Sequence, residues 1–314
     1  KSMALIDMIF GLIMTVGVIV LFFSTLNKGG SMGSILSGLS DINPGLTSAV
    51  GPPGWWPLFA LIFLTSVAPF AMPQLIQKFY AVRDKQSVKI GTYASTAFAL
   101  LIGGVAYFLG STTPLFITPT THAHIFSETG VPIFDRLMPE LLTNVIHPSL
   151  SILILLLILS ASMSTLASLV LISSSAFTKD FYMGFINKKA RDKTLTTLMR
   201  VTSIFFISIS VYLAYLEPST IVSILGISWG ALGSFFLGPF IWGLFSRDTK
   251  KVSAYIAGLT GLLICSGLYL QGMSSPEAGT IGMLTSLILP ALVNPVVKRV
   301  GTRRDAGTTT LLQS

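Results

Sequence analysis

Eight long apolar stretches constrain the fold of this 314-residue chain more than any other feature of its sequence. Each has the length of roughly 20 residues that a helix needs to cross a bilayer core, and none alternates in polarity as a membrane strand would. Only 10% of the residues are charged and the mean hydropathy is +0.78, which excludes a disordered chain and a nucleic-acid-binding module. The single cysteine excludes a disulfide-stapled fold. The sequence therefore predicts an all-α integral membrane protein with about eight transmembrane helices, near Ala4–Leu26, Pro57–Tyr80, Val88–Gly110, Ser149–Thr178, Leu195–Leu216, Ser219–Phe245, Val252–Leu270 and Ala278–Val297.

The basic residues predict how these helices are oriented. If all eight stretches cross the membrane, 18 of the 20 Lys and Arg residues lie on one face, and only Lys28 and Arg136 lie on the other. Cytoplasmic loops carry an excess of Lys and Arg, so we expect a multi-pass protein of the cell (plasma) membrane with both chain ends in the cytoplasm. The net charge of +8 then reflects topology, and no nucleic acid partner is expected.

Two long loops lie on the opposite face. Asn27–Trp56 is rich in Gly and Ser, whereas Ser111–Pro148 holds the three histidines and a short amphipathic segment at Ile133–Asn144. The spacing of His122, His124 and His147 fits no metal motif, which favours a solvated loop over a metal site. No phosphate-binding loop, nucleophile triad or carboxylate pair is present, so we do not expect an enzyme.

The second stretch is interrupted by two prolines near its centre, Pro69 and Pro73. Each removes a backbone donor, and the freed carbonyls near Thr65 and Ser66 need another partner inside the bilayer. Broken helices of this kind form ion and substrate sites in many secondary transporters. A simple proline kink satisfied by neighbouring helices is the alternative.

The fourth stretch carries a strip of small and hydroxyl residues. On a helix, Ala161, Ser164, Thr165, Ser168 and Ser175 fall within about one third of the circumference. Neutral oxygens suit a weakly held monovalent cation. The same residue types also allow two helices to pack closely, and the pattern alone leaves both interpretations open.

Two further features stand out among the apolar stretches. Asp7 is the only carboxylate clearly inside one of them, which makes it a candidate for ion binding or proton exchange, or a group that reaches water at the helix end. The sixth stretch contains Gly226 and Gly230 at the spacing of close helix packing, which we favour over a gating role.

These elements, in this order, resemble the sodium:solute symporter family. Lys1–Phe10 resembles the start of the family's fifth core helix, although Ile6 and Phe10 replace its Thr and Gln. Met72–Ala81 and Gly238–Phe245 resemble the ends of the sixth and tenth. The most specific match is Leu159–Tyr182, which contains Ser-Ala-Ser-Met-Ser-Thr-Leu-Ala-Ser followed by Ser-Ser-Ser-Ala-Phe-Thr-Lys-Asp-Phe-Tyr.

The resemblance implies a LeuT-type inverted-repeat transporter fold. Residues 1–300 would form a partial transmembrane transporter domain, with the first four core helices missing, and residues 301–314 a cytoplasmic tail. We therefore expect the C-terminal part of a longer carrier, unable to transport by itself.

The resemblance also implies the site residues. The coupling ion Na⁺ would be bound by the backbone carbonyl of Ala161 and the hydroxyls of Ser164 and Thr165. Asp7 and Ser168 match a second Na⁺ or proton site of some members, although Ala167 stands where those members carry serine. The residues expected to face the substrate are Thr65, Ser66, Pro69 and Ser228.

The function implied is sodium-coupled symport of a small organic solute, such as an amino acid or carboxylate, by alternating access. The alternative is a symporter-like sensory or solute-binding membrane module without transport. A channel is disfavoured because no charge ring or filter-like repeat is present. The expected partners are the solute and the lipid bilayer; the sequence does not define an oligomeric state.

Overall fold

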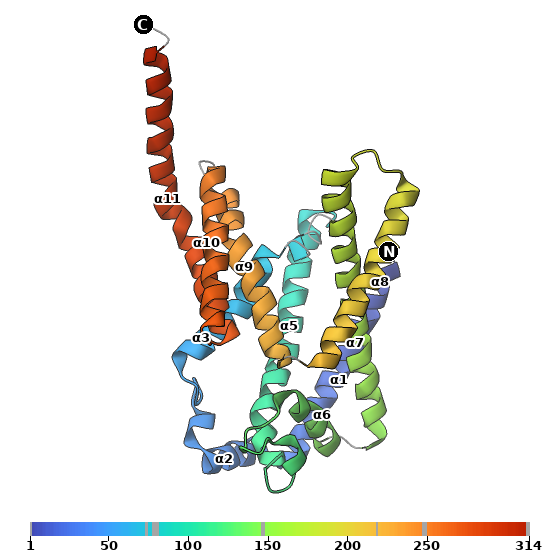
Figure 1. The fold of residues 1–314 in the computed structure, drawn as a ribbon. Helices are drawn as coiled ribbons and strands as arrows, with labels where there is room; N and C mark the ends of the chain where they lie inside the picture. Colours follow the sequence, from blue (N-terminus) through green and yellow to red (C-terminus); the bar gives the residue numbers. More distant parts are fainter. Residues whose placement is uncertain are drawn as a thin grey trace. The chain divides into compact units, whose positions relative to one another are not determined.

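The computed structural model describes residues 2–72, 75–76, 82–145, 148–217, 219–246 and 250–311. Within these ranges it describes the side chains outside residues 2–7, 145, 148–151, 153–154, 157, 160, 164 and 296–311. The chain divides into two compact units, one formed by Lys1–Gly51 with Val82–Pro218 and the other by Pro52–Ala81 with Ser219–Ser314. The described elements are almost all helical (Figure 1), as predicted.

The first unit begins with the long helix α1 and contains most of the loop structure. Its elements are α1 (Ser2–Gly29), α2 (Met32–Ile42), the 3₁₀ turn η1 (Pro44–Thr47), α5 (Lys85–Phe116), the 3₁₀ turn η3 (Ala123–Ile125), α6 (Phe134–Val145), α7 (Pro148–Ser175), the π-helix η4 (Ala176–Ile186) and α8 (Asp192–Leu216). The second unit contains α3 (Trp55–Val67), the 3₁₀ turn η2 (Ala68–Ala71), α9 (Ile221–Phe245), α10 (Lys251–Leu270) and α11 (Ser275–Leu311).

Within the described residues, seven helices are long and apolar enough to cross a membrane. Their spanning segments are Met8–Gly29, Lys85–Phe116, Ala161–Ile186, Asp192–Leu216, Ile221–Phe245, Lys251–Leu270 and Ser275–Pro295. They overlap seven of the eight predicted stretches. The chain is therefore a multi-pass membrane protein. Helix α11 continues to Leu311, so helical structure extends into the segment predicted as a tail.

The remaining predicted span, the second stretch Pro57–Tyr80, does not form a single membrane-crossing helix. Helix α3 has 13 residues, which is about 20 Å of helix, and it passes into the 3₁₀ turn η2 that contains Pro69. Met72 is extended (φ −86°, ψ 114°), as expected for a residue that precedes a proline. The described part of this segment is therefore a broken helix rather than a kinked one. Pro73 itself lies outside the described residues.

The loops of the first unit contain two helices. The amphipathic segment predicted at Ile133–Asn144 is confirmed as α6, whose Leu141 is fully buried in a cluster with residues of α1 and α5. Helix α2 was not predicted, because Asn27–Trp56 was interpreted as a loop. Ser31 begins α2 by accepting a hydrogen bond from the Ser34 N–H, and Ile35 is buried on its inner face.

Glycines allow α9, α10 and α11 of the second unit to pack closely (Figure 1). Pro290 frees the carbonyl of Ser286, and Pro239 frees that of Phe235, because proline has no N–H to donate four residues back. Each freed carbonyl faces a glycine: a Cβ on Gly238 would lie 1.9 Å from the Ser286 oxygen, and one on Gly258 2.7 Å from the Phe235 oxygen. The predicted pair, Gly226 and Gly230, faces Ser275 and Gly279 of α11, where an added Cβ would clash, so the packing role expected of these glycines is confirmed.

Asp84 caps the N-terminus of α5 and gives that end a pH dependence. The Ser87 N–H donates to Asp84 Oδ1 over 2.7 Å, and this hydrogen bond lowers the pKa of the carboxyl from its ordinary value. Because the folded-state pKa is depressed, the cap stabilises α5 above the unfolded-state pKa, and that stabilisation is lost as pH falls through the folded-state pKa.

We expect Asp84→Ala to speed amide hydrogen exchange of the first α5 turn severalfold at pH 7. If the exchange rates of these amides are unchanged in Asp84→Ala, Asp84 does not stabilise the start of α5.

Candidate functional site

Helix α7 presents the hydroxyl strip predicted from the sequence. It contains no glycine and no proline after Pro148, so 28 residues continue without a break. The hydroxyl of Thr165 donates a hydrogen bond to the carbonyl oxygen of Ala161, and the two oxygens are 3.1 Å apart. Thr165 is exposed in this chain, and Ala161 is half-buried. Two of the three predicted cation ligands therefore form a neighbouring oxygen pair on an accessible helix face.

The Ala161–Thr165 pair has a spacing suited to a cation. Oxygen ligands lie about 2.3–2.6 Å from Ca²⁺, whose size is similar to that of Na⁺, so adjacent ligands of such an ion are separated by roughly 3–3.5 Å. The Thr165 proton points to Ala161, which leaves the lone pairs of the hydroxyl oxygen available to accept an ion. The geometry is therefore compatible with one edge of a coordination shell, but it does not single out this pair, because Thr15, Thr92 and Thr196 donate to the carbonyl four residues back in the same way.

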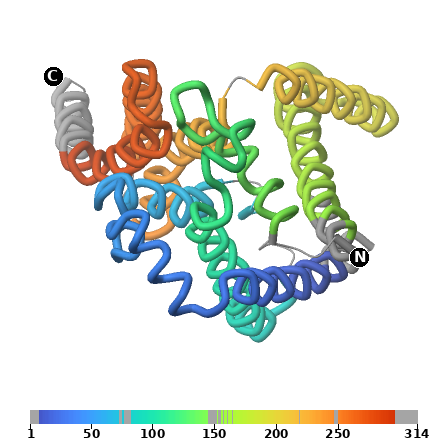
Figure 2. Tube along the Cα trace, turned by 90° about the horizontal axis from the view of Figure 1, so that it is seen from below, coloured from blue at the N-terminus to red at the C-terminus, as the bar shows by residue number. Residues whose placement is uncertain are grey.

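The remaining predicted ion ligands are only partly described. The side chains of Ser164 and Asp7 lie outside the described part of the chain. Helix α1, which carries Asp7, packs against α7, which carries the half-buried Ser168 (Figure 1 and Figure 2). The two helices of the predicted second site are therefore neighbours, as that site requires.

Other hydroxyls of α7 have structural roles that the sequence did not distinguish. Ser174 Oγ donates to the Val170 carbonyl over 2.7 Å and lies 2.8 Å from Ser203 Oγ on α8. This buried contact joins α7 to α8. The fully buried hydroxyl of Thr178 in η4 has no hydrogen-bond partner among the described residues. Its position inside a π-helix, a conformation frequent at functional sites, is a feature that sequence reasoning missed.

The predicted substrate residues lie on α3, η2 and α9 of the second unit. Thr65 Oγ1 donates to the Leu61 carbonyl over 2.8 Å, and Ser228 Oγ donates to the Leu225 carbonyl over 3.2 Å. Ser66 and Ser228 are exposed, and Pro69 is half-buried in η2, which packs against α9. In the described part of the chain, no hydrogen bond joins Ser66 to Ser228. The structure brings their elements together but not their side chains.

The histidines of the α5–α7 loop are not simply solvated, as the sequence had suggested. His122 and His124 both approach Glu140 on α6, while His147 lies outside the described residues. Among the described residues, no group of three His, Cys, Asp or Glu side chains is arranged to hold a metal ion. Sequence reasoning missed Glu140, although it lies on the polar face of the predicted amphipathic helix.

Seven helices of the described residues that are long and apolar enough to cross a bilayer describe a multi-pass membrane protein. A family profile, described as the sodium:solute symporter family, matches residues 1–261. The chain belongs to that family.

Several curated proteins are similar to the chain. The osmoregulated proline transporter OpuE of Bacillus subtilis is 27% identical over 73% of this chain and 46% of its own length. The sodium/proline symporter of Haemophilus influenzae is 28% identical over 62% of this chain and 37% of its own length. The sodium/pantothenate symporter of the same species is 23% identical over 86% of this chain and 54% of its own length. The chain thus spans about half the length, or less, of these relatives.

Proposed function

We propose that this chain is part of a carrier that couples the uptake of a small organic solute to the entry of Na⁺. The observation that carries the proposal is membership of the sodium:solute symporter family over residues 1–261. Relatives named for symport of sodium with proline or pantothenate support it. The Ala161 carbonyl and the Thr165 hydroxyl, 3.1 Å apart on a membrane helix, are compatible with it.

In this proposal, Na⁺ is cargo and α7 provides part of its binding site. The Ala161 carbonyl, the Ser164 hydroxyl and the Thr165 hydroxyl bind the ion, and other segments of the complete carrier supply the remaining ligands. These oxygens are neutral, so the ion is held weakly enough to be released where the Na⁺ concentration is low. Asp7 on α1 and Ser168 on α7 form the candidate second Na⁺ or proton site.

The solute would bind at the broken helix of the second unit. Thr65, Ser66 and Pro69 belong to this segment, and Ser228 lies on the adjacent α9. Backbone groups that a broken helix leaves unpaired are suited to binding polar groups of a solute near the bilayer midplane. If Na⁺ binding favours the conformation that accepts solute, each ligand raises the affinity of the other by the same factor. The Na⁺ gradient then drives uptake by alternating access.

The proposed architecture is the LeuT-type inverted repeat. Residues 1–300 would form the transporter domain, without the first four core helices of that fold, and residues 301–314 a cytoplasmic tail. In this proposal the broken segment Pro57–Tyr80 also crosses the membrane, as an eighth, discontinuous span; both chain ends then lie in the cytoplasm with 18 of the 20 basic residues. No specific observation favours the alternative of a sensory module without transport.

The test is an uptake panel with the complete carrier in proteoliposomes. Proline, pantothenate and other small solutes are offered with an inward gradient of Na⁺ or, as control, of K⁺. We expect uptake of at least one solute to require Na⁺ and to be competed by its analogues. Uptake that proceeds equally with K⁺ would contradict sodium coupling, and saturable solute binding without any uptake would favour the sensory alternative.

A further inference from the structure

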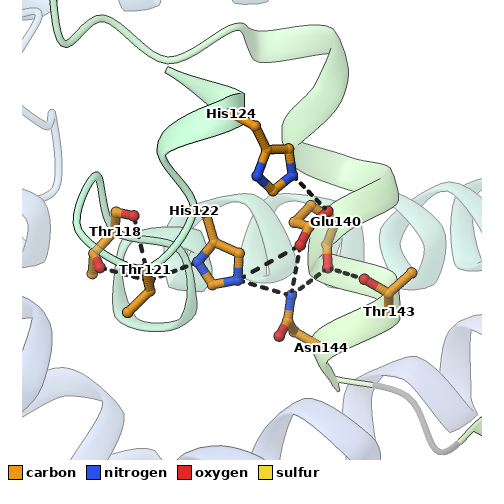
Figure 3. A network of polar contacts seen from close by, with 7 residues as sticks. All are labelled: Thr118, Thr121, His122, His124, Glu140, Thr143 and Asn144. Carbon is orange, nitrogen blue, oxygen red and sulfur yellow. Dashed lines mark hydrogen bonds and ion pairs between the residues drawn. The ribbon is translucent and has the colours of Figure 1, made fainter.

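The loop between α5 and α7 contains a polar network that none of the proposed transport steps uses. His122 and His124 come from the segment around η3, and Glu140 and Asn144 come from α6 (Figure 3). His122 Nε2 lies 3.6 Å from Glu140 Oε1, and His124 Nε2 lies 3.6 Å from Glu140 Oε2. Two imidazoles therefore approach the two oxygens of one carboxylate. The network joins the η3 segment to α6.

The network is partly shielded from solvent. The side chains of His122 and Glu140 are 15% and 27% exposed, whereas that of His124 is 68% exposed. Thr121 Oγ1 is 2.7 Å from His122 Nδ1 and holds the ring in place. A charge pair between His122 and Glu140 is consequently less screened than one at an open surface.

His122 Nε2 has two alternative partners. Asn144 Nδ2 lies 3.3 Å from it, and Glu140 Oε1 lies 3.6 Å from it on the same helix. An amide N–H donates only to an unprotonated ring nitrogen, so the contact with Asn144 suits neutral His122. Protonated His122 carries an N–H at Nε2, which is repelled by the amide and attracted by the carboxylate. Asn144 Nδ2 also donates to the Glu140 carbonyl oxygen over 2.9 Å, so it does not depend on His122 for a partner. The partner that His122 Nε2 favours therefore depends on whether this nitrogen carries a proton.

This network adjoins an apolar cavity of about 580 Å³. Thr118 and Phe126, which lie before and after η3 in the chain, line the cavity together with Phe134, Leu137 and Met138 of α6. Thr118 Oγ1 is 2.8 Å from Thr121 Oγ1, which in turn contacts His122 (Figure 3). The His122 ring is thus connected to the cavity wall through the hydroxyls of Thr121 and Thr118. A movement of the η3 segment relative to α6 changes the width of the cavity.

We propose that His122, His124 and Glu140 form a pH-sensitive latch that clamps the η3 segment onto α6 at acidic pH and narrows the apolar cavity between them. The other charged groups on the surrounding elements are Lys28 at the end of α1, Asp41 on α2, Glu128 in the loop, and Asp135 and Arg136 on α6. Among the described residues, Glu140 is the carboxylate that both histidines approach.

The direction of the effect follows from the charges. Imidazole is the side chain whose charge changes in the physiological pH range, and a carboxylate attracts the ring once the ring carries a proton. Acidification therefore adds up to two attractions between imidazolium and carboxylate, and the latch is tighter at acidic than at alkaline pH. In the proposed topology this loop lies outside the cell, so external pH would set its state.

The latch can be tested by fluorescence quenching in the complete carrier. Every native cysteine of the carrier, including Cys265, is replaced by alanine. A bimane label is attached at Met138→Cys on α6, and a tryptophan quencher is placed at Ala123→Trp in η3. We expect the ratio of closed to open loop to rise about fivefold between pH 8 and 5.5. The rise should shrink in high choline chloride, which screens the charges.

Matched variants decide whether the named side chains are responsible. The double variant His122→Gln with His124→Gln should abolish the pH response, and so should Glu140→Gln, which carries the test if the histidine variant does not fold. Glu128→Gln removes the same charge from the same loop and should retain the response. The proposal is overturned if quenching is equal at both pH values, or if its pH dependence survives in the folded histidine variant or in Glu140→Gln. Because the readout needs no solute, it is independent of the proposed transport function.

Discussion

Replacing Ser164 and Thr165 together with alanine is expected to raise the Na⁺ concentration for half-maximal uptake on the order of 100-fold in the complete carrier. Each hydroxyl bound to a charged partner contributes about 1.5–3 kcal/mol, and about 1.4 kcal/mol corresponds to a tenfold change in affinity. The apparent solute affinity should fall as well at limiting Na⁺, because the coupling is reciprocal. The measurement is solute uptake into proteoliposomes over a range of Na⁺ concentrations.

Ser162→Ala is the matched control on the same helix. Ser162 is exposed, and its hydroxyl donates to the Ile158 carbonyl over 2.8 Å, away from the Ala161–Thr165 pair. The Na⁺ dependence of this variant should equal that of the parent. If the double variant keeps the parent's Na⁺ dependence, or if Ser162→Ala weakens it equally, the hydroxyl strip is not the ion site.

The second large effect is expected from Gly238→Ala in α9. The added Cβ would lie 1.9 Å from the Ser286 carbonyl oxygen, so α9 and α11 must separate. They would also lose the hydrogen bond from the Gly238 N–H to Ser286 Oγ (3.2 Å). Overpacking that forces the backbone to shift typically costs about 1–3 kcal/mol, and occasionally more. Thermal unfolding of the purified carrier in detergent should therefore shift to a markedly lower temperature.

Gly243→Ala, one and a half turns further along α9, is the control for this substitution. A Cβ at Gly243 would meet no atom within 4 Å, and alanine is favoured over glycine inside a helix by about 0.8–1 kcal/mol. This variant should be as stable as the parent or slightly more stable. Equal stability of the Gly238 and Gly243 variants would show that α9 and α11 do not pack as described.

Hydropathy predicted most of the helices because a bilayer imposes one strong rule on a spanning segment. The rule failed at Pro57–Tyr80, where composition is apolar but Pro69 ends the regular helix near Val67. It also overlooked α2, which is too short to span. The local signals of α2 were present: Ser31 as a capping residue, followed by Ile35 and Leu39 at helical spacing.

The candidate ion site could be predicted as a helix face but not as a geometry. The spacing of Ala161 and Thr165 places them one turn apart, yet the direction of the Thr165 hydroxyl depends on its rotamer, which sequence does not define. The contact of His122 with Glu140 was beyond prediction for a different reason. These residues are 18 positions apart and meet only because the loop folds back onto α6.

A high-resolution map of the complete carrier in Na⁺ tests the central claim most directly. We predict cation density about 2.3–2.6 Å from the Ala161 carbonyl oxygen, Ser164 Oγ and Thr165 Oγ1. This density should disappear when Na⁺ is replaced by choline. A map in which these three oxygens face lipid, with no density beside them in either condition, would contradict the account.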